Sequence, residues 1–371
     1  MSWSDLHKAS EELATAAHLA LRDGDGAAAQ ALFRRSAKAE EEALAQLHSA
    51  NKPRTFGITA VSAVALWYKG GDLAQAEAIA YRVLGHANIE EFAGMQLRTL
   101  LQAIWNVRAQ EVAGVSFAPG QVQVSVRGGE IITGGAPLDL IIEKVQTIQS
   151  LFYRTAEWMK KMPLRRRGPA PKEIQEMCRP WLFQGVPSSY QFVVAIERPR
   201  QQDWVSLDSP DPQLVASTFL SILKNAIDDP ADGLSKIIPD KQYKTAFLKL
   251  ARNLSPTGKV FNQMEVRAVG DASPVVLVPE SRKLIGLTLK ADAPPAGEAM
   301  VPSTVRGVLR AVHLDHDWLE VTEEDGENVR IWNVGEALDD VIGPMVNHPV
   351  DVQALKDNKG KLHFRDIERE E

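Results

Sequence analysis

The apolar positions of this chain follow three patterns in succession, and each predicts a different kind of element. Residues 1–112 have a helical spacing interrupted by short glycine-containing turns. Beyond Gly114, apolar and polar residues alternate as in strands, around one long helical run. We therefore expect a multidomain α+β protein: all-α helical repeats at 1–112, a central α+β domain with a mainly antiparallel sheet at 115–292, and a small β-barrel at 302–371.

The strongest helical pattern, Leu138–Met162, lies in the central region. Its polar face includes Arg154 and Glu157, and we expect its apolar seam to pack on a sheet, the alternative being a partner helix. The seam consists of Leu138, Ile141, Val145, Ile148, Phe152, Met159 and Met162. Further helices are predicted at 171–177, 212–228 and 240–254, and strands at 122–126, 130–132, 189–197, 263–269, 275–278 and 284–289, the first two as a hairpin.

After a linker at 291–302, the C-terminal residues predict a compact β-rich domain. Three strands, one helix and two strands in this order are typical of an OB-like barrel, with an SH3-like barrel as the alternative. The predicted elements are strands at 304–312, 318–322 and 328–332, a helix at 335–342, and strands at 350–355 and 361–367.

The helical region contains an internal repeat. Gly24–Leu32 and Gly71–Ile79 align without a gap at a separation of 47 residues, and each stretch has a helix before it and after it. With Leu66, Trp67 and Tyr68 before the second turn and Ala74, Ala78 and Tyr81 after it, this region resembles the helical pairs of tetratricopeptide repeats, although the spacing differs from the usual ~34 residues. A fifth helix is expected around 90–111. The resemblance implies a surface that binds another protein, with Trp67, Tyr68 and Tyr81 as partner-binding residues.

The central and C-terminal parts carry a second, weaker resemblance. A strand hairpin, the PLDLI stretch that opens the long helix, the SSYQFVVAIERP strand and the small barrel together are similar to uncharacterised bacterial proteins from variable genomic regions. This resemblance implies a bacterial source and a defence-associated context, and it brings no catalytic motif with it.

Composition is that of an ordinary globular protein, with 44% hydrophobic and 24% charged residues. No apolar run reaches the roughly 18 to 20 residues of a membrane-spanning helix, and the N-terminus lacks a signal-peptide core, so we expect a cytoplasmic protein without membrane contact. A single cysteine, Cys178, excludes an intramolecular disulfide and any multi-cysteine metal site.

The net charge of −6 is unevenly distributed. Residues 301–371 contain eight Lys and Arg but sixteen Asp and Glu, whereas residues 160–200 contain nine basic and three acidic residues. The basic segment predicts docking on nucleic acid or on an acidic partner, including the acidic barrel itself, and the alternative is a solvated loop. Its candidate residues are Lys160, Lys161, Arg165, Arg166 and Arg167.

The barrel also has aromatic residues that could stack on bases, namely Trp318, Trp332 and Phe364. Because the charge of residues 301–371 is −8, long-range repulsion argues against nucleic-acid binding there. We therefore assign these aromatic side chains to the core or to a protein interface.

Motifs that carry chemistry are missing from the sequence. There is no phosphate-binding loop, zinc-protease motif, nucleophile elbow or dinucleotide loop. The densest group of potential metal ligands, His313-Leu314-Asp315-His316-Asp317, falls at a strand turn and is expected to be a solvated hairpin. Cys178, between Met177 and Arg179, is expected in the core. We predict no catalytic residue, no metal and no cofactor.

Together these patterns predict a non-enzymatic interaction scaffold or regulatory subunit that binds a protein partner through its helical repeats. The competing hypothesis is a nucleic-acid-binding regulator that uses residues 160–200. An enzyme that uses the cluster at 313–317 is the third hypothesis.

Overall fold

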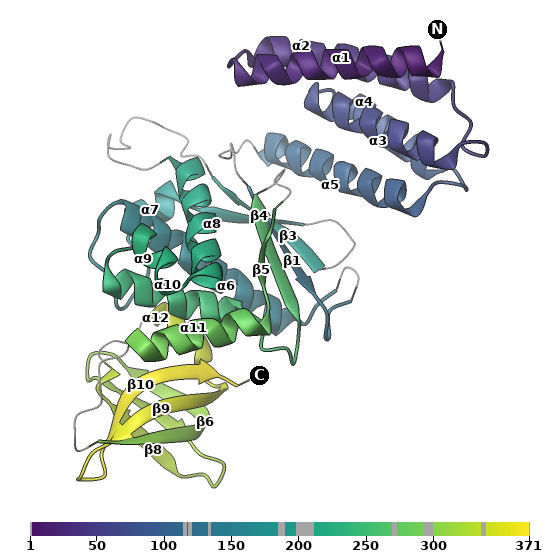
Figure 1. Ribbon diagram of the computed structural model, residues 1–371. Helices are drawn as coiled ribbons and strands as arrows, with labels where there is room; N and C mark the ends of the chain where they lie inside the picture. Colours follow the sequence, from purple (N-terminus) through teal and green to yellow (C-terminus); the bar gives the residue numbers. More distant parts are fainter. Residues whose placement is uncertain are drawn as a thin grey trace. The chain divides into compact units, whose positions relative to one another are not determined.

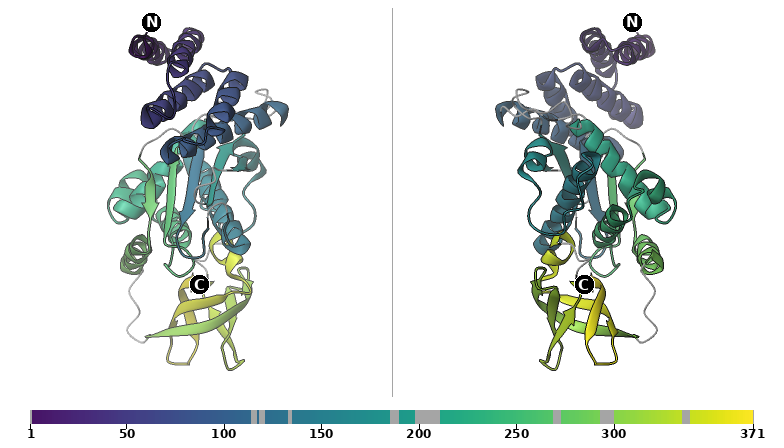
Figure 2. Two further views of the ribbon diagram at one scale, coloured as in Figure 1. Left: turned by 90° about the vertical axis from the view of Figure 1, so that its right-hand side faces the viewer. Right: turned by 90° about the vertical axis from the view of Figure 1, so that its left-hand side faces the viewer.

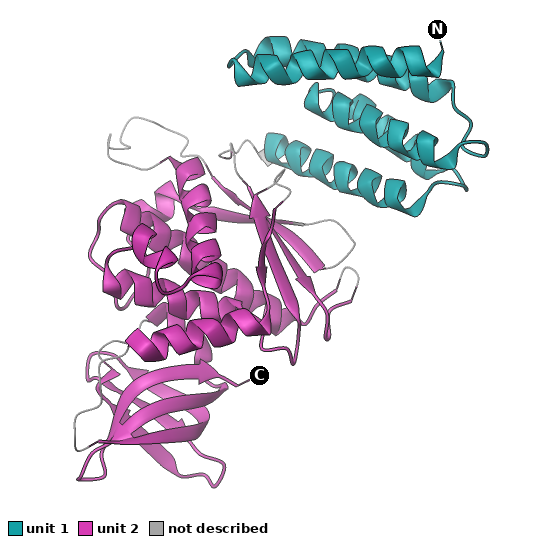
Figure 3. Cartoon of the chain, in the orientation of Figure 1, with its two compact units in different colours: residues 1–114, 184–188 teal, residues 115–183, 189–371 magenta. Residues whose placement is uncertain are grey.

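The computed structural model describes residues 2–113, 117, 121–132, 135–184, 190–197, 211–268, 273–292, 300–334 and 339–370. Its contacts divide the chain into two compact units, one of residues 1–114 with 184–188 and one of residues 115–183 with 189–371 (Figure 3). The predicted mixture of helices with mainly antiparallel sheets is confirmed. The separate barrel domain at 302–371 stays a prediction, because the barrel is grouped with the central residues in the second unit. None of the helices within the described residues is long and apolar enough to cross a membrane.

The first unit consists of five helices: α1 (Trp3–Arg22), α2 (Gly26–Ala45), α3 (Pro53–Lys69), α4 (Leu73–Leu84) and α5 (Glu91–Ala113) (Figure 1). Consecutive helices pack on one another, and α3 also packs on α5. Alanines with no exposed surface, including Ala60, Ala76 and Ala80, lie in the interfaces and allow the helices to approach closely.

The repeat in the sequence becomes a repeated turn. Gly24 and Gly71 both have positive φ, and the next residue, Asp25 or Asp72, caps the following helix with its carboxylate. In both turns the aspartate N–H donates to the carbonyl five residues earlier and the glycine N–H to the carbonyl three residues earlier, which is the Schellman arrangement. Identical turn chemistry therefore produces the two helical pairs.

A five-stranded sheet organises the central part of the second unit, in the order β2-β3-β1-β4-β5. Its strands are β1 (Val122–Arg127), β2 (Pro180–Gln184), β3 (Tyr190–Ile196), β4 (Gln263–Ala268) and β5 (Val275–Leu277). Helix α8 (Pro212–Asp228) packs on β3, β4 and β5, while α6 (Leu138–Met159) and α10 (Lys241–Leu254) pack on α8. Figures 1 and 2 show these helices on one side of the sheet. The shorter helices are α7 (Lys172–Met177), α9 (Gly233–Ile237) and α11 (Pro279–Asp292).

Two of the predicted elements in this region are wrong, and one strand was missed. Residues 130–132 do not pair with β1 as a hairpin; β1 pairs with β3 and β4 instead. Residues 284–289 belong to α11, which begins at Pro279, a residue suited to a first helical turn. Strand β2 was not predicted at all.

Helix α6 departs most from its prediction. Its principal contacts are with other helices, especially α8 and α10, and Phe152 stacks on Phe219 at 4.4 Å. Leu138, placed on the apolar seam, is exposed, whereas Arg154 and Glu157 from the polar face are buried. Their burial is explained by charged partners from distant parts of the chain.

The C-terminal strands close on themselves in the order β10-β8-β7-β6-β9 (light green to yellow in Figure 2). They are β6 (Val301–His313), β7 (Trp318–Thr322), β8 (Asn328–Trp332), β9 (Pro349–Lys356) and β10 (Leu362–Arg369). Neighbouring strands are antiparallel except β8 and β10, which are parallel. Helix α12 (Asp339–Ile342) and a 3₁₀ turn at Gly343–Met345 connect β8 to β9. The predicted helix began at residue 335, and its first part, 335–338, lies outside the described residues. Residues 293–299 of the predicted linker also lie outside them.

Two clusters of ion pairs join the barrel to the central helices. Arg154 has no exposed surface, and its guanidinium donates to Asp340 at 2.7 and 2.9 Å and to Glu157 at 3.2 Å. Arg165 donates to the other oxygen of Glu157 at 2.9 Å. We call Arg154, Glu157, Arg165 and Asp340 the α6–α12 charge cluster.

The second cluster joins α10 to β10. Arg252, also buried, donates to both carboxylate oxygens of Asp366 at 2.5 and 3.0 Å and to the carbonyl of Ile367 at 2.9 Å. Glu368 lies 3.0 Å from Arg252 and 3.4 Å from Arg282. Burial acts to raise the pKa of Asp366, but the charge and hydrogen bonds of Arg252 outweigh it and hold that pKa below its usual range.

Replacing Arg154 by leucine should destabilise the second unit by about 3–5 kcal/mol, because Asp340 and Glu157 would remain buried with Arg165 as their only remaining cation within the α6–α12 charge cluster. The control is Arg306→Leu, which removes an exposed pair with Asp351 and should cost no more than about 1 kcal/mol. Hydrogen exchange of α6 and β10 peptides at increasing urea measures the local free energy of opening. Equal effects of the two substitutions would contradict the structural importance of the cluster.

Candidate functional site

The most distinctive exposed surface of the first unit lies on α4 and α5. Ala74, Ala78 and Tyr81 follow one another at steps of four and three, so they share one side of α4, and all three are exposed. Trp105 of α5 is 42% exposed and Tyr81 is 52% exposed. We call Ala74, Ala78, Tyr81 and Trp105 the α4–α5 face.

The α4–α5 face also corrects an expectation from the tetratricopeptide resemblance, in which alanines fit the helices together. The two alanines that carried the resemblance after the second turn, Ala74 and Ala78, point outward, and α4 packs through Ala76, Ile79 and Ala80 instead. An outward stripe of small residues beside two aromatic side chains is open to another chain.

Glu77 holds the two helices of this face together. One of its oxygens accepts a hydrogen bond from the indole N–H of Trp105 at 2.9 Å, and the other pairs with Arg108 at 2.5 Å. Since Glu77 lies one turn before Tyr81 on α4, the carboxylate orients Trp105 on the side of α4 that carries Tyr81. The Trp105 side chain is thus held in place before binding, which lowers the entropic cost of ordering it there.

The other two predicted partner-binding residues have less exposed surface. Trp67 and Tyr68 are partly buried against the core of α3, α4 and α5, and burial raises the pKa of Tyr68. The Trp67 indole N–H donates to Glu41 at 3.1 Å, and the same carboxylate accepts from Gln75 at 3.1 Å and from Arg82 at 3.2 Å. The Glu41 carboxylate therefore ties α2, α3 and α4 together through Trp67.

Sequence reasoning missed Trp105. A signal was present, because Leu97, Leu101 and Ile104 mark the buried side of α5 and Trp105 falls one position away from it. The sequence pattern predicts the fifth helix around 90–111 but gives no contact role to the large apolar residue outside its buried stripe.

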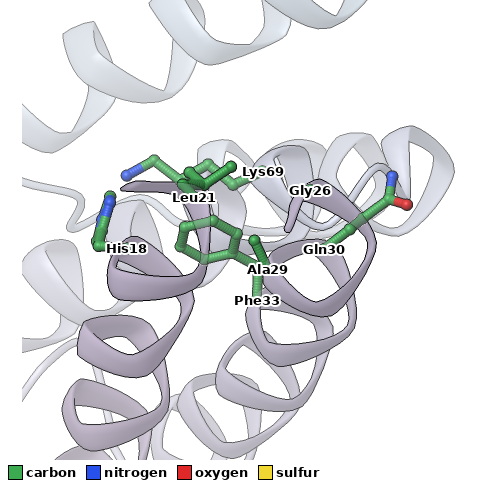
Figure 4. Close-up of a pocket in the computed structure, with 7 residues that line it drawn as sticks. All are labelled: His18, Leu21, Gly26, Ala29, Gln30, Phe33 and Lys69. Carbon is green, nitrogen blue, oxygen red and sulfur yellow. The ribbon is translucent and has the colours of Figure 1, made fainter. Parts of the chain in front are cut away.

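A cavity of about 380 Å³ opens between the turn ends of the two helical pairs (Figure 4). Phe33 and Ala29 supply apolar surface, Leu21 lies at the edge, and Lys69 places its ammonium 5.5 Å above the Phe33 ring. His18 borders the cavity and contacts the edge of Phe33. An apolar floor next to a cation suits a partner side chain that is apolar and has a carboxylate nearby.

The basic segment is largely engaged within the second unit. Arg165 belongs to the α6–α12 charge cluster, Lys160 lies 3.3 Å from Glu173, and Arg167 pairs with Asp315 of the β6–β7 turn. Arg166 is exposed, and its carbonyl accepts the N–H of Asp339 at 3.0 Å. Two ion-pair partners of this segment, Asp340 and Asp315, therefore come from the acidic barrel of the same chain, which was one of the partners considered. Arg198 and Arg200 lie outside the described residues.

The cluster at 313–317 forms a turn at the end of the barrel. His313 accepts the N–H of His316 at 3.0 Å with its Nδ1, and the two imidazole rings lie 4.1 Å apart. Asp315 is engaged by Arg167. Over the described part of the chain, no three His, Cys, Asp or Glu side chains are arranged to hold a metal ion.

Cys178 should resist alkylation at pH 8 in the folded protein. Its side chain has no exposed surface, and burial raises its pKa to about 12, so about one thiol in 10⁴ is ionised at that pH, against roughly a quarter for an ordinary cysteine of pKa ~8.5. We expect iodoacetamide to label Cys178 at least about 100-fold more slowly in buffer than in 6 M guanidinium chloride, as measured by mass spectrometry. Rapid labelling of the folded chain would instead indicate a reactive thiol.

Comparison with known proteins leaves this chain without a match. No family model fits it, and neither a curated protein nor a solved structure is similar to it. The resemblance of the N-terminal helices to tetratricopeptide repeats remains an expectation, and what the chain binds must be inferred from its own surfaces.

Proposed function

We propose that this protein is a non-enzymatic interaction scaffold or regulatory subunit that binds a protein partner through its N-terminal helical pairs. The observation that carries the proposal is the α4–α5 face. Tyrosine and tryptophan are the residues that most often dominate binding energy at protein interfaces, and here Tyr81 and Trp105 are exposed together on a rigid surface.

The chemistry of the face favours a helical segment as its partner. Ala74 and Ala78 allow a second backbone to approach α4 closely, while Tyr81 and Trp105 supply large apolar contacts. An amphipathic helix with one apolar stripe would satisfy both requirements. A carboxylate on that partner would find the cavity beside Lys69 as a second contact.

The resemblance of the other parts to bacterial proteins from variable genomic regions suggests a role for this scaffold in bacterial defence. In this proposal the second unit forms the body of the molecule, and we infer that its barrel is OB-like. The parallel pairing of the third and fifth barrel strands, β8 and β10, with a helix between the third and fourth, supports an OB-like over an SH3-like class.

The alternative function, a nucleic-acid-binding regulator that uses residues 160–200, has less support from the side chains. Lys160, Arg165 and Arg167 are in ion pairs within their own unit, so contacts with phosphates would have to compete with those carboxylates. Arg166 is the exposed candidate that remains from the arginine run.

The double substitution Tyr81→Ala/Trp105→Ala should reduce partner recovery at least about 10-fold, because two aromatic anchors are removed. The measurement is quantitative affinity purification of the tagged full-length chain from its native cell. The matched control is Leu287→Ala, which truncates an exposed side chain of α11 in the second unit and should leave recovery unchanged. If the wild-type chain recovers no stoichiometric protein, or the double variant recovers as much as the control, the proposal fails.

A further inference from the structure

A row of four aromatic side chains crosses the outer surface of the barrel. Strand register pairs His313 of β6 with Trp318 of β7, Trp318 with Trp332 of β8, and Trp332 with His363 of β10. Neighbouring strands are about 4.8 Å apart, so the row spans about 14 Å. We call His313, Trp318, Trp332 and His363 the barrel aromatic row. Both tryptophans are partly exposed, whereas the residues of β7 and β8 that point into the barrel core are Leu319, Val321 and Ile331.

Cations lie directly on this row. The guanidinium carbon of Arg330 is 4.2 Å from the ring centre of Trp318 and 5.9 Å from that of Trp332, and the Lys361 ammonium is 4.4 Å from the Trp332 ring centre. At the other end, His316 adds a ring 4.1 Å from His313. Arg167 pairs with the adjacent Asp315, which brings the exposed basic loop of the central part to this end of the row.

The charge of −8 for residues 301–371 no longer excludes an anionic ligand here. Asp340, Asp366 and Glu368 are paired with arginines of the central helices. A net charge summed over residues 301–371 alone does not include these arginines. The acidic turn Glu323–Glu327 lies about five residues along the strands from Trp318 and Trp332, or about 17 Å, which exceeds the Debye length of about 8 Å at physiological salt.

The carboxylates beside the row are mostly engaged. Glu320 accepts from Arg330 at 2.9 Å. Asp357 lies 3.1 Å from Nε2 of His363, and its hydrogen bonds with His363 and with the N–H groups of Lys361 and Lys359 hold its pKa below the usual range. Asp317 is a remaining negative charge directly before Trp318.

From this geometry we propose that the barrel aromatic row binds single-stranded nucleic acid. Flat aromatic rings at successive strand positions stack with bases of any sequence. Lys361 is placed to contact a phosphate between them, and Arg330 can contact a second one in competition with its Glu320 partner. In OB-folds the surface of the second and third strands, flanked by the first and fourth interstrand loops, is the usual position for oligomeric ligands. The row occupies the equivalent strands, β7 and β8, between the loops at 314–317 and 357–361.

Single-stranded nucleic acid fits this surface better than a neutral ligand does. A neutral sugar would have to displace the two cations from the tryptophan faces and would offer them no counter-charge. A nucleotide brings a phosphate that draws each cation off its ring while the base replaces it there. The row is independent of the α4–α5 face, so the two surfaces are testable separately.

The test is fluorescence anisotropy of the full-length chain with labelled 12-nucleotide oligo(dT) and oligo(U) at 50 mM salt. We expect saturable binding to at least one of them and at least about 10-fold weaker binding to a 12-base-pair duplex, whose bases are not free to stack. With two phosphate contacts, from Arg330 and Lys361, affinity should fall roughly 7-fold between 50 and 200 mM salt. Preference between the two oligomers decides whether RNA or DNA is the ligand.

Variants locate the site. Trp332→Ala should weaken binding at least about 10-fold through lost stacking, Trp332→Phe should retain most of it, and Asp317→Asn should strengthen it by removing a negative charge. Asp317 has φ of 61°, which asparagine tolerates, so this variant should fold normally. If Trp332→Ala does not fold, Lys361→Gln is used in its place. Trp3→Ala in the first unit, which truncates a partly exposed tryptophan outside both proposed surfaces, is the matched tryptophan control and should change nothing.

Three results would overturn the proposal. The first is absence of saturable binding to both oligomers at 50 mM salt. The second is an equal affinity of the Trp3→Ala control and of the Trp332→Ala variant or its substitute, Lys361→Gln. The third is quenching of tryptophan fluorescence by a neutral hexasaccharide, with none by either oligomer.

Discussion

The buried guanidinium of Arg154 constrains the whole second unit. Taking an arginine out of water is costly, and that cost is offset only when its charge and its N–H groups are matched by carboxylates. Arg154 obtains them from Glu157 on its own helix and from Asp340, which lies beyond three barrel strands in the sequence. Helix α6, the loop that carries Arg165 and the barrel must therefore be assembled together. The continuous apolar core that these parts share is consistent with this requirement.

The same ion pairs change the electrostatic character of the barrel. Considered alone, residues 301–371 form a strongly acidic segment, and residues 160–200 form a basic one. In the folded chain two ion pairs join the segments, between Arg165 and Asp340 and between Arg167 and Asp315, and arginines of α6 and α10 compensate Asp340 and Asp366 as well. Among the local charges at the surface, Lys361 lies over the Trp332 ring, whereas Arg330 is shared between the Trp318 ring and the Glu320 carboxylate. Binding is governed by these residual charges because salt screens the more distant ones.

Two surfaces of different chemistry result. The α4–α5 face combines small residues with a tyrosine and a tryptophan whose indole N–H is satisfied by Glu77, so it offers mainly apolar contact. The barrel aromatic row combines rings with cations held over them, so it offers stacking with charge. A chain with both surfaces has the means to join a protein partner to a polymer ligand. Both surfaces are built on regular helices and strands, which hold their side chains in place before any ligand arrives.

Local sequence patterns were sufficient to predict most helices, strands and turns, but not which of these elements pack or pair with one another. The glycine and aspartate of each repeat turn determine that turn by themselves, and the alternation at 318–322 and 328–332 predicts two barrel strands with the bounds observed. Residues 284–289 were misread because a short apolar run fits a strand and a helix equally well. Trp67, Tyr68 and Tyr81 could be selected from sequence, and so could Trp318 and Trp332 as possible stacking residues. Their alignment in one row with His313 and His363 follows only from the strand register. Arg154 was placed on a solvent-facing side because its carboxylate partner is 186 residues away. Periodicity reports which side of an element is apolar, and only the tertiary structure decides which charges find one another and can be buried.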